Sequence, residues 1–418
     1  MTTSQKHVTI LVANLPAERD RRVIRESLTL ESAGLQVTVI APRGDKRLKV
    51  LPGSQNTRLR PYPVYVLGGG FLSFAVEFLW SFTWIALLLA KEVLSGRAHA
   101  VQVCNPPDVY WPLALVFRLL RRPWVFDHHD LSPEVYATRS NGNPNKYVYG
   151  LLVFFERMTL RTASAVFATN ESFRENAERR GVPADRIAVV RNGPRRDEIV
   201  RATAAPSSDG LHKLVYLGVL GPQDNVECAV LAAEELIKLR GRSDWRLTIA
   251  GDGETLGDLT KLVADRGLGD VVEFVGWLGS SEVDDLLRTA TVGIQPDAPT
   301  KMNDLSTMAK TVEYLGRGVP VVAADLTETR RTAGDAAVYV PGGTPAEFAA
   351  AIHLLLDDPT KRASMREVAL SRFDEQLSWE PQAARYLATW DRLLKRTVAI
   401  PRQRTAPSSE TATESVSR

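Results

Sequence analysis

The chain has 418 residues, which at roughly 150 residues per domain corresponds to two or three domains. Apolar residues make up 44% and charged residues 24%, a balance typical of a folded protein, so a chain that is disordered throughout is excluded. Lysine and arginine number 52 against 49 aspartate and glutamate, and this near neutrality argues against a dedicated nucleic-acid-binding protein. The two cysteines, Cys104 and Cys228, exclude a disulfide scaffold and favour a reducing, cytoplasmic compartment.

The first half of the chain alternates between strand-like and helix-like segments. Its strand-like runs are short, rich in Val and Ile and free of polar alternation, which is typical of strands covered on both faces. Alternation of β and α at this spacing predicts a parallel sheet with crossover helices. The expected strands are 7–13, 35–41, 100–104, 124–128 and 163–168, and the expected helices are 21–33, 112–120 and 147–160.

The same alternation starts again after residues 203–211, a stretch without apolar periodicity that we interpret as a linker. Each half carries enough strands for a sheet of its own, so we predict two doubly wound α/β domains. Residues 359–397 are expected to be helical, and the polar tail 399–418 is expected to be disordered. The strands expected in the second half are 213–218, 245–250, 271–275, 292–295 and 319–323, and the helices are 226–239, 257–266, 281–288 and 306–316.

Polar residues crowd the loop 127–134, which reads DHHDLSPE and follows an expected strand. In open α/β sheets ligands bind at the carboxyl ends of strands, so this loop is a candidate for chemistry. A pair such as His129 with Asp127 can act as acid and base or bind a metal, although no further His or Cys lies at ligand spacing. The alternative is a solvated loop in which Asp130 or Ser132 caps the next helix.

Two other loops that follow expected strands leave two interpretations open. Asn105-Pro-Pro-Asp108 is a rigid turn in which Asp108 either caps the next helix or contacts a substrate. Gly218 and Gly221 either let the backbone approach a phosphate closely or form a tight turn.

The segment 303–320 (NDLSTMAKTVEYLGRGVP) holds the strongest local combination of residues. Ser306 is a good N-cap, so it predicts a helix that starts there and presents free N–H groups to an anion. Lys310 and Glu313 lie one turn apart on the same face. A cation beside a helix N-terminus suits a diphosphate, and a carboxylate one turn further on suits ribose hydroxyls. The alternative is an ordinary surface salt bridge between the two side chains.

An aromatic stretch runs from Phe71 to Ala90 with Glu77 as its one charged residue. It is long enough to span a bilayer. Ser73, Glu77 and Ser81 form a polar stripe that a lipid-embedded helix does not need. Three interpretations stay open: a buried helix between other elements, a helix that lies on a membrane surface, and a true membrane span.

Three motifs together, at 127–134, at 218–223 (GVLGPQ) and at 306–314 with the following Gly318-Val-Pro, resemble family 4 glycosyltransferases. Members of this family are retaining enzymes of GT-B fold, and many build bacterial surface polysaccharides. The resemblance implies two Rossmann-like domains that face each other across a cleft. It implies an acceptor-binding domain at 1–202, a nucleotide-sugar-binding domain at 212–375 and a helix at 376–398 that crosses back to the first domain.

The resemblance also implies roles for particular residues, although several family positions are changed. Glu313 matches the second glutamate of the family's Glu-x7-Glu motif, which binds the donor ribose, whereas Leu305 stands at the first. Val219 and Asp224 stand where the family commonly has basic residues for the diphosphate. Lys310 and the helix N-terminus are therefore expected to take over that role.

Cys104 or Asn105 stands in place of the family's acceptor-side histidine, so His129 becomes the candidate for the reaction centre. The expected catalytic residues are His129, Asp130 and Asp127, the expected donor-binding residues are Gly218, Gly221, Lys310, Glu313, Ser306 and Thr307, and Asn105 and Glu134 are expected on the acceptor side. No metal or cofactor is expected, because N–H dipoles and Lys310 would stabilise the departing diphosphate.

The function that follows is retaining transfer of a sugar from a nucleotide-diphosphate sugar to a glycan or lipid-linked acceptor in surface polysaccharide or glycoconjugate biosynthesis. Two alternatives stay open: a nucleotide-sugar epimerase of the same fold, and a degenerate protein that binds a nucleotide sugar or a partner enzyme without turnover. The expected location is the cytoplasm, with peripheral contact to the inner face of the cell membrane through the aromatic stretch. No nucleic-acid partner is expected.

Overall fold

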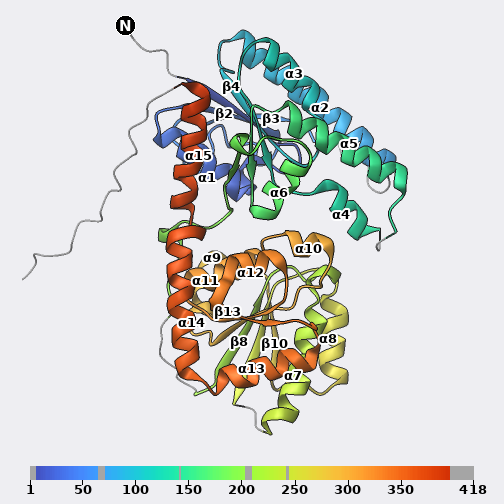
Figure 1. Ribbon diagram of the computed structural model, residues 1–418, viewed down its shortest axis with the longest axis vertical. Coiled ribbons are helices and arrows are strands. Elements are labelled where there is room, and N and C mark those ends of the chain that lie inside the picture. The colour runs from blue at the N-terminus through green and yellow to red at the C-terminus, as the bar shows by residue number, and fades with distance from the viewer. Residues whose placement is uncertain (1–5, 65–70, 141–142, 203–209, 242–243, 396–418) are drawn as a thin grey trace, which may run out of the picture.

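The computed structural model describes residues 6–64, 71–140, 143–202, 210–241 and 244–395, and these form two α/β domains (Figure 1). Each domain is built on one parallel sheet with helices on both faces, as the alternation of segments predicts. Most of the expected linker 203–211 and the whole of the expected disordered tail 399–418 lie outside the described residues.

The first sheet, within the described residues, has seven parallel strands in the order β3-β2-β1-β4-β5-β6-β7. The strands at its centre are buried along their length because helices cover both faces. The strand order reverses between β1 and β4, which places a crevice at the carboxyl ends of the strands there. The strands are β1 (His7–Leu11), β2 (Gln36–Pro42), β3 (Arg58–Tyr62), β4 (Ala100–Cys104), β5 (Trp124–His128), β6 (Ala165–Ala168) and β7 (Ile187–Val189).

Alternate residues of each strand supply the two core layers of the first domain. Ile10 and its neighbours pack against α1 and α15, whereas Leu11 and Val103 pack against α2, α3, α5 and α6. The helices concerned are α1 (Arg21–Ser32), α2 (Phe71–Leu94), α3 (Trp111–Leu119), α4 (Ser132–Arg139), α5 (Lys146–Thr162), α6 (Glu171–Arg179) and α15 (Trp379–Leu394).

The second sheet has six parallel strands among the described residues, in the order β10-β9-β8-β11-β12-β13, and its order reverses between β8 and β11. Its strands are β8 (His212–Leu217), β9 (Trp245–Ala250), β10 (Val272–Gly276), β11 (Val292–Gln295), β12 (Val321–Ala324) and β13 (Ala337–Val340). Its helices are α7 (Val226–Arg240), α8 (Leu256–Asp265), α9 (Ser280–Arg288), α10 (Lys301–Leu305), α11 (Ala309–Arg317), α12 (Thr327–Ala333), α13 (Pro345–Leu356) and α14 (Pro359–Arg372).

The chain crosses between the domains twice, and the two crossing segments touch. The N–H of Trp379 donates to the carbonyl of Pro194 over 2.9 Å. A Cβ on Gly193 would lie 1.7 Å from the carbonyl oxygen of Leu377, so this contact requires glycine. After the second crossing, α15 runs along the first domain (Figure 1), where Trp390 is completely buried in its core.

The aromatic stretch forms the first part of α2, and this helix lies half in the core. Ile85 and Leu89 are buried against the first sheet, whereas Leu79 and Leu87 are 67% and 54% exposed. Within the part of the chain that the structure describes, no helix has the length and apolar character that a bilayer crossing requires. The interpretation of this stretch as a true membrane span is therefore wrong.

Candidate active site

A cavity of about 210 Å³ lies between the two domains, where the strand-end loops of both sheets meet. The first domain lines it with the segments that follow β5, β6 and β7, and the second with the turn between α10 and α11 and the start of α11. Its volume of about 210 Å³ is below the roughly 300–1,000 Å³ of pockets that enclose a whole ligand, so it is too small to enclose one completely. The lining residues are His129, Asp130, Thr169, Asn170, Phe173, Arg191, Asn192, Gly193, Ser306, Thr307, Ala309, Val312 and Leu377.

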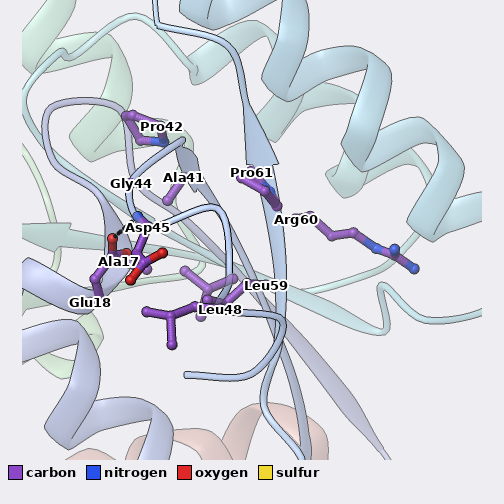
Figure 2. Close-up of a pocket in the computed structure, with 11 residues that line it drawn as sticks. Ala17, Glu18, Ala41, Pro42, Gly44, Asp45, Leu48, Leu59, Arg60 and Pro61 are labelled. Atoms are coloured by element: carbon purple, nitrogen blue, oxygen red, sulfur yellow. Dashed lines mark hydrogen bonds between the residues drawn. The ribbon is translucent and has the colours of Figure 1, made fainter. Parts of the chain in front are cut away.

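A second, much smaller cavity of about 20 Å³ lies at the carboxyl ends of β2 and β3 (Figure 2). The carboxylate of Glu18 accepts a hydrogen bond from the N–H of Asp45 over 2.8 Å beside it, and the side chain of Arg60 extends away from it. The cavity has room for about one water molecule. It is therefore too small for a sugar or a nucleotide.

His129 is held in the larger cavity by a buried carboxylate. Asp127 is fully buried, and its Oδ2 lies 2.6 Å from His129 Nε2. Arg22, from α1, donates two hydrogen bonds of 3.0 and 2.7 Å to the same carboxylate. Burial opposes the charge on the imidazole, but Asp127 outweighs it and raises the pKa of His129. Burial also opposes ionisation of Asp127, yet Arg22 and His129 hold its pKa well below the usual range.

Further buried side chains connect this carboxylate to the crossing helix. Gln102 donates to Asp127 over 3.1 Å and to Glu26 over 2.6 Å, and the hydroxyl of Tyr386 on α15 donates to Gln102 Oε1 over 2.7 Å. Burial, followed by repulsion from Asp127, raises the pKa of Glu26 well above its usual range. The network therefore favours the charge on Asp127 over the charge on Glu26, and the carboxylate of Asp127 orients His129.

The two residues expected on the acceptor side lie behind the cavity and do not line it. Asn105 is fully buried; its Oδ1 accepts from the N–H groups of His129 and Asp130 over 2.6 and 3.2 Å, and its amide donates to the carbonyl of Asp130. Glu134 is buried on α4 and accepts from Lys301 of the second domain over 2.9 Å. Asn105 therefore positions the loop that carries His129 and Asp130, and Glu134 forms an ion pair between the two domains.

Three side chains at the base of the cavity have the chemistry of metal ligands. One ligand atom each from Cys104, Asp127 and His129 lies within 4.8 Å of the others. Arg22 already occupies both oxygens of Asp127, and burial raises the pKa of the Cys104 thiol well above its usual value, which disfavours a thiolate. The residues present therefore fit a buried guanidinium better than a metal ion.

The helix that carries Lys310 and Glu313 begins later than predicted. Ser306 ends α10, and its hydroxyl donates to the carbonyl of Met302 over 2.7 Å, so it does not cap the next helix. The helix α11 starts at Ala309, which corrects the predicted start at Ser306. Ser306 and Thr307 line the cavity beside this new helix start.

Neither Lys310 nor Glu313 faces the cavity as a free group. Lys310 is buried and donates to Asp297 over 2.8 Å and to Asp224 over 3.0 Å. Burial opposes the charge of its ammonium, but these two carboxylates raise its pKa. Glu313 pairs with Arg317 over 2.6 Å and not with Lys310. The ammonium expected to hold a diphosphate is thus already neutralised, and the predicted surface pair between Lys310 and Glu313 does not form.

The glycines expected at the donor serve a close contact between two loops. A Cβ on Gly251 would lie 1.8 Å from the carbonyl oxygen of Gly218, and one on Gly218 would lie 3.0 Å from Lys310 Cε. A Cβ on Gly221 would meet the side chain of Gln223. Backbone packing between the loops after β8 and β9 therefore requires small residues, whatever ligand binds nearby.

The residues of the cavity and its support that the sequence analysis missed include Arg22, Asn170 and Arg191. Asn170 caps α6 and donates across the domain boundary to the carbonyl of Leu305 over 2.9 Å. Asn170 follows β6, so the strand-end rule that pointed to His129 also applies to it, whereas Arg191 follows β7, a strand that was not predicted. Arg22 follows no strand, and its part in the site is recognisable only from its hydrogen bonds to Asp127 in the structure.

Two family descriptions match most of the chain. Residues 21–193 match "Glycosyl transferase 4-like domain" and residues 212–358 match "Glycosyl transferases group 1". Alpha-D-kanosaminyltransferase of Streptomyces kanamyceticus is 29% identical over 290 residues, which are 67% of this chain and 72% of that protein.

Solved structures agree on the fold. Sucrose-phosphate synthase from Thermosynechococcus elongatus superposes with a TM-score of 0.73 at 17% identity, over 94% of this chain and all of that one. Anabaena HepE in complex with UDP gives a TM-score of 0.68 at 15% identity, over 93% of this chain and 100% of that one. The chain therefore belongs to the group 1 glycosyltransferases of GT-B fold, enzymes that transfer a glycosyl group from a nucleotide sugar.

Proposed function

We propose that this chain transfers a sugar, with retention of configuration, from a nucleotide-diphosphate sugar to a hydroxyl of a glycan or lipid-linked acceptor in surface polysaccharide or glycoconjugate biosynthesis. The observation that carries the proposal is the position of His129. Its imidazole, fixed by Asp127, lines the same cavity as the first turn of α11. Asp130 lines this cavity too, and desolvation raises the pKa of its carboxyl.

In the proposed reaction, the bond between the sugar C1 and the diphosphate oxygen breaks as C1 gains positive charge. The acceptor hydroxyl attacks C1 from the same face, and its proton passes to the departing phosphate oxygen, so atoms and charge balance. The first N–H groups of α11 stabilise the charge on the leaving diphosphate. We assign Asp130 to the sugar or the acceptor hydroxyl, His129 to orientation of the sugar, and Glu313 to the donor ribose. No metal takes part in this scheme.

The donor class is tested by thermal unfolding with UDP, GDP and ADP, first in EDTA and then with Mg²⁺. UDP is the first probe because HepE, of the same fold, was solved in complex with it. A ligand at 100 times its dissociation constant stabilises by roughly 2.7 kcal/mol, and we expect Glu313→Ala to abolish most of this gain. No stabilisation by any of the three nucleotides would contradict the proposal.

Transfer itself is tested by release of free nucleotide from the nucleotide sugar with and without acceptor. We expect release only when acceptor is present. An epimerase would convert the donor without acceptor, and a non-catalytic protein would bind the nucleotide sugar and release nothing. Either of those outcomes would replace transfer as the function.

We also propose that the enzyme contacts a membrane surface through α2. Leu79 and Leu87 project from it, and Leu119 of α3 is 84% exposed beside the exposed Arg118. Helices α2, α3 and α5 lie next to one another on one side of the first domain (Figure 1). Exposed apolar side chains beside arginine suit the boundary of an anionic bilayer, which would bring the cleft to a lipid-linked acceptor.

The membrane contact is tested by sedimentation with anionic and with neutral vesicles. We expect Leu79→Glu with Leu87→Glu to reduce sedimentation with anionic vesicles, whereas Trp84, which packs in the core, is a poor target. Leu354→Glu is the matched control, because Leu354 is 69% exposed on α13 of the other domain. Unchanged sedimentation of the folded double variant would exclude α2 as the contact.

A further inference from the structure

Arg191 is a cation without a hydrogen-bond partner in the cavity wall. Its N–H donates to Gln382 over 3.0 Å, which fixes the backbone where the chain leaves β7. The side chain is only 12% exposed, yet its guanidinium donates no hydrogen bond to any residue that the structure describes. Its ion-pair partner, Glu328 Oε2, lies 3.8 Å from Nη1, which is beyond hydrogen-bonding distance.

The Oε1 of Glu328 is bonded by other groups, whereas its Oε2, the atom nearest Arg191, has no hydrogen-bond partner among the described residues. Its Oε1 accepts from the N–H and the hydroxyl of Ser172 over 2.9 and 2.7 Å, and from Arg331 over 3.0 Å. Arg331 pairs closely with this carboxylate and also with Glu175, whereas Arg191 has only its distant contact with Glu328 Oε2. Burial lowers the pKa of Arg191, although Glu328 and Glu171 oppose this shift. A buried charged donor without an acceptor costs free energy, which an anion in the cavity would recover.

The same cavity offers further groups that suit an anion. Ala309 lines the cavity and is the first residue of α11, so its N–H group and that of the next residue have no partner within the helix. Arg191 is the only lysine or arginine that lines the cavity among the described residues. The ammonium of Lys310 is bonded to two carboxylates, and the usual basic positions are Val219 and Asp224.

We infer that Arg191 binds a phosphate of the donor's diphosphate and balances the charge that develops as the diphosphate leaves. This inference rests on the proposed function and names the residue that supplies its missing cation. The guanidinium comes from the first domain and the free N–H groups come from the second, so the diphosphate would contact both sides of the cleft.

The affinity test compares a nucleoside diphosphate with its own nucleoside by calorimetry, using UDP and uridine or whichever of the UDP, GDP and ADP pairs the wild type binds. We expect Arg191→Gln to weaken the diphosphate by about 10- to 100-fold and to leave the nucleoside unchanged, because only the diphosphate reaches the guanidinium. Arg191→Lys should recover part of the loss. Arg331→Gln is the matched control, since it also removes a cation from Glu328 but lies outside the cavity wall.

A second measurement separates this role from a latch between the domains. Removing a buried guanidinium that donates no hydrogen bond should leave the urea midpoint of the ligand-free protein unchanged or higher, whereas removing a latch lowers it. Equal losses for diphosphate and nucleoside, or the same losses in Arg331→Gln, would overturn the inference.

Unchanged diphosphate affinity together with a raised KM for the acceptor would also overturn it and would assign Arg191 to an acceptor phosphate. In both cases the proposed function would stand, because the wild type would still bind a nucleoside diphosphate. Failure of the wild type to bind any of the three diphosphates would overturn the proposed function and this inference together.

Discussion

The charged residues on the two sides of the cleft differ in how completely they are paired and buried. On the first-domain side, Asp127 is bonded to Arg22 and still holds His129, whose side chain keeps 17% of its surface exposed at the cavity. On the second-domain side, Lys310 is closed between Asp224 and Asp297 and keeps only 6%. The segment 303–320, which holds the strongest combination of residues in the sequence, is thus the one whose lysine is already paired with carboxylates. The chemistry available at a site depends on which groups keep an unpaired face, and not on how many charged residues a motif holds.

Asp127→Asn is the substitution from which we expect the largest effect, because it removes the central carboxylate on the first-domain side. It leaves the buried guanidinium of Arg22 with Glu26 as its remaining acidic neighbour and removes the partner of His129. We expect a loss of about 3–5 kcal/mol in the free energy of unfolding, measured by urea denaturation, and loss of nearly all transfer activity. Asp197→Asn is the control, because that carboxylate is 65% exposed and also pairs with an arginine. Equal stability of the two variants would show that the buried network is not needed for the fold.

The next largest effect is expected for His129→Gln, and it falls on activity. Misplacement of a bound reactant can cost about 10²-fold in rate, so kcat should fall by about that factor while the fold is retained. An unchanged kcat would remove His129 from the reaction centre.

The same variant gives a pH test with a definite sign. The folded-state pKa of His129 is raised above 6.5, so its pairing with Asp127 stabilises the fold fully below pH 6.5. That contribution is lost as the pH rises through the folded-state value. The difference in unfolding free energy between wild type and His129→Gln should therefore shrink as the pH is raised above 6.5. A difference that is independent of pH would mean that the ring is held by packing alone.

Much of the fold follows from runs of apolar residues, and the exceptions have a physical cause. β4, β5, β9 and β11 coincide with the predicted segments because both faces of these strands are covered. β3 has the sequence RLRPY and was missed, because it forms the edge of its sheet and keeps Arg58 exposed. An edge strand with polar residues shows no apolar run from which it can be predicted.

The site was predictable only as far as it depends on one loop. His129 follows the end of β5, so the strand-end rule was enough to place it. The partners of Lys310 lie 86 and 13 residues away, and no spacing within α11 reveals them. Arg191 likewise becomes recognisable only when β7, α12 and α11 are seen together. Charge pairing across long sequence distances is what the sequence alone could not supply.

Lys310→Met tests the second-domain side of the cleft, where the lysine is paired with two carboxylates. Asp297 is 2% exposed and would lose its closest cation, so we expect the free energy of unfolding to fall by about 2–3 kcal/mol. The double variant with Asp297→Asn should recover part of that loss. We expect the nucleotide affinity of the folded protein to stay within about twofold of wild type, because the ammonium already donates hydrogen bonds to two carboxylates. A large fall in affinity with unchanged stability would show that Lys310 turns to the ligand after all.

The smallest effect is expected where a buried charge meets an exposed one. Lys301 is 68% exposed, whereas its partner Glu134, across the domain boundary, is 6% exposed. Water screens the exposed end, so a double-mutant cycle of Lys301→Met with Glu134→Gln should give a coupling of about 0.5–1 kcal/mol that weakens in high salt. A coupling above about 2 kcal/mol would show that this pair is as strong as a fully buried ion pair. A weak coupling would mean that the contact between α4 and α10 opens easily, so that the cleft can admit a donor while Asp127 keeps His129 in place.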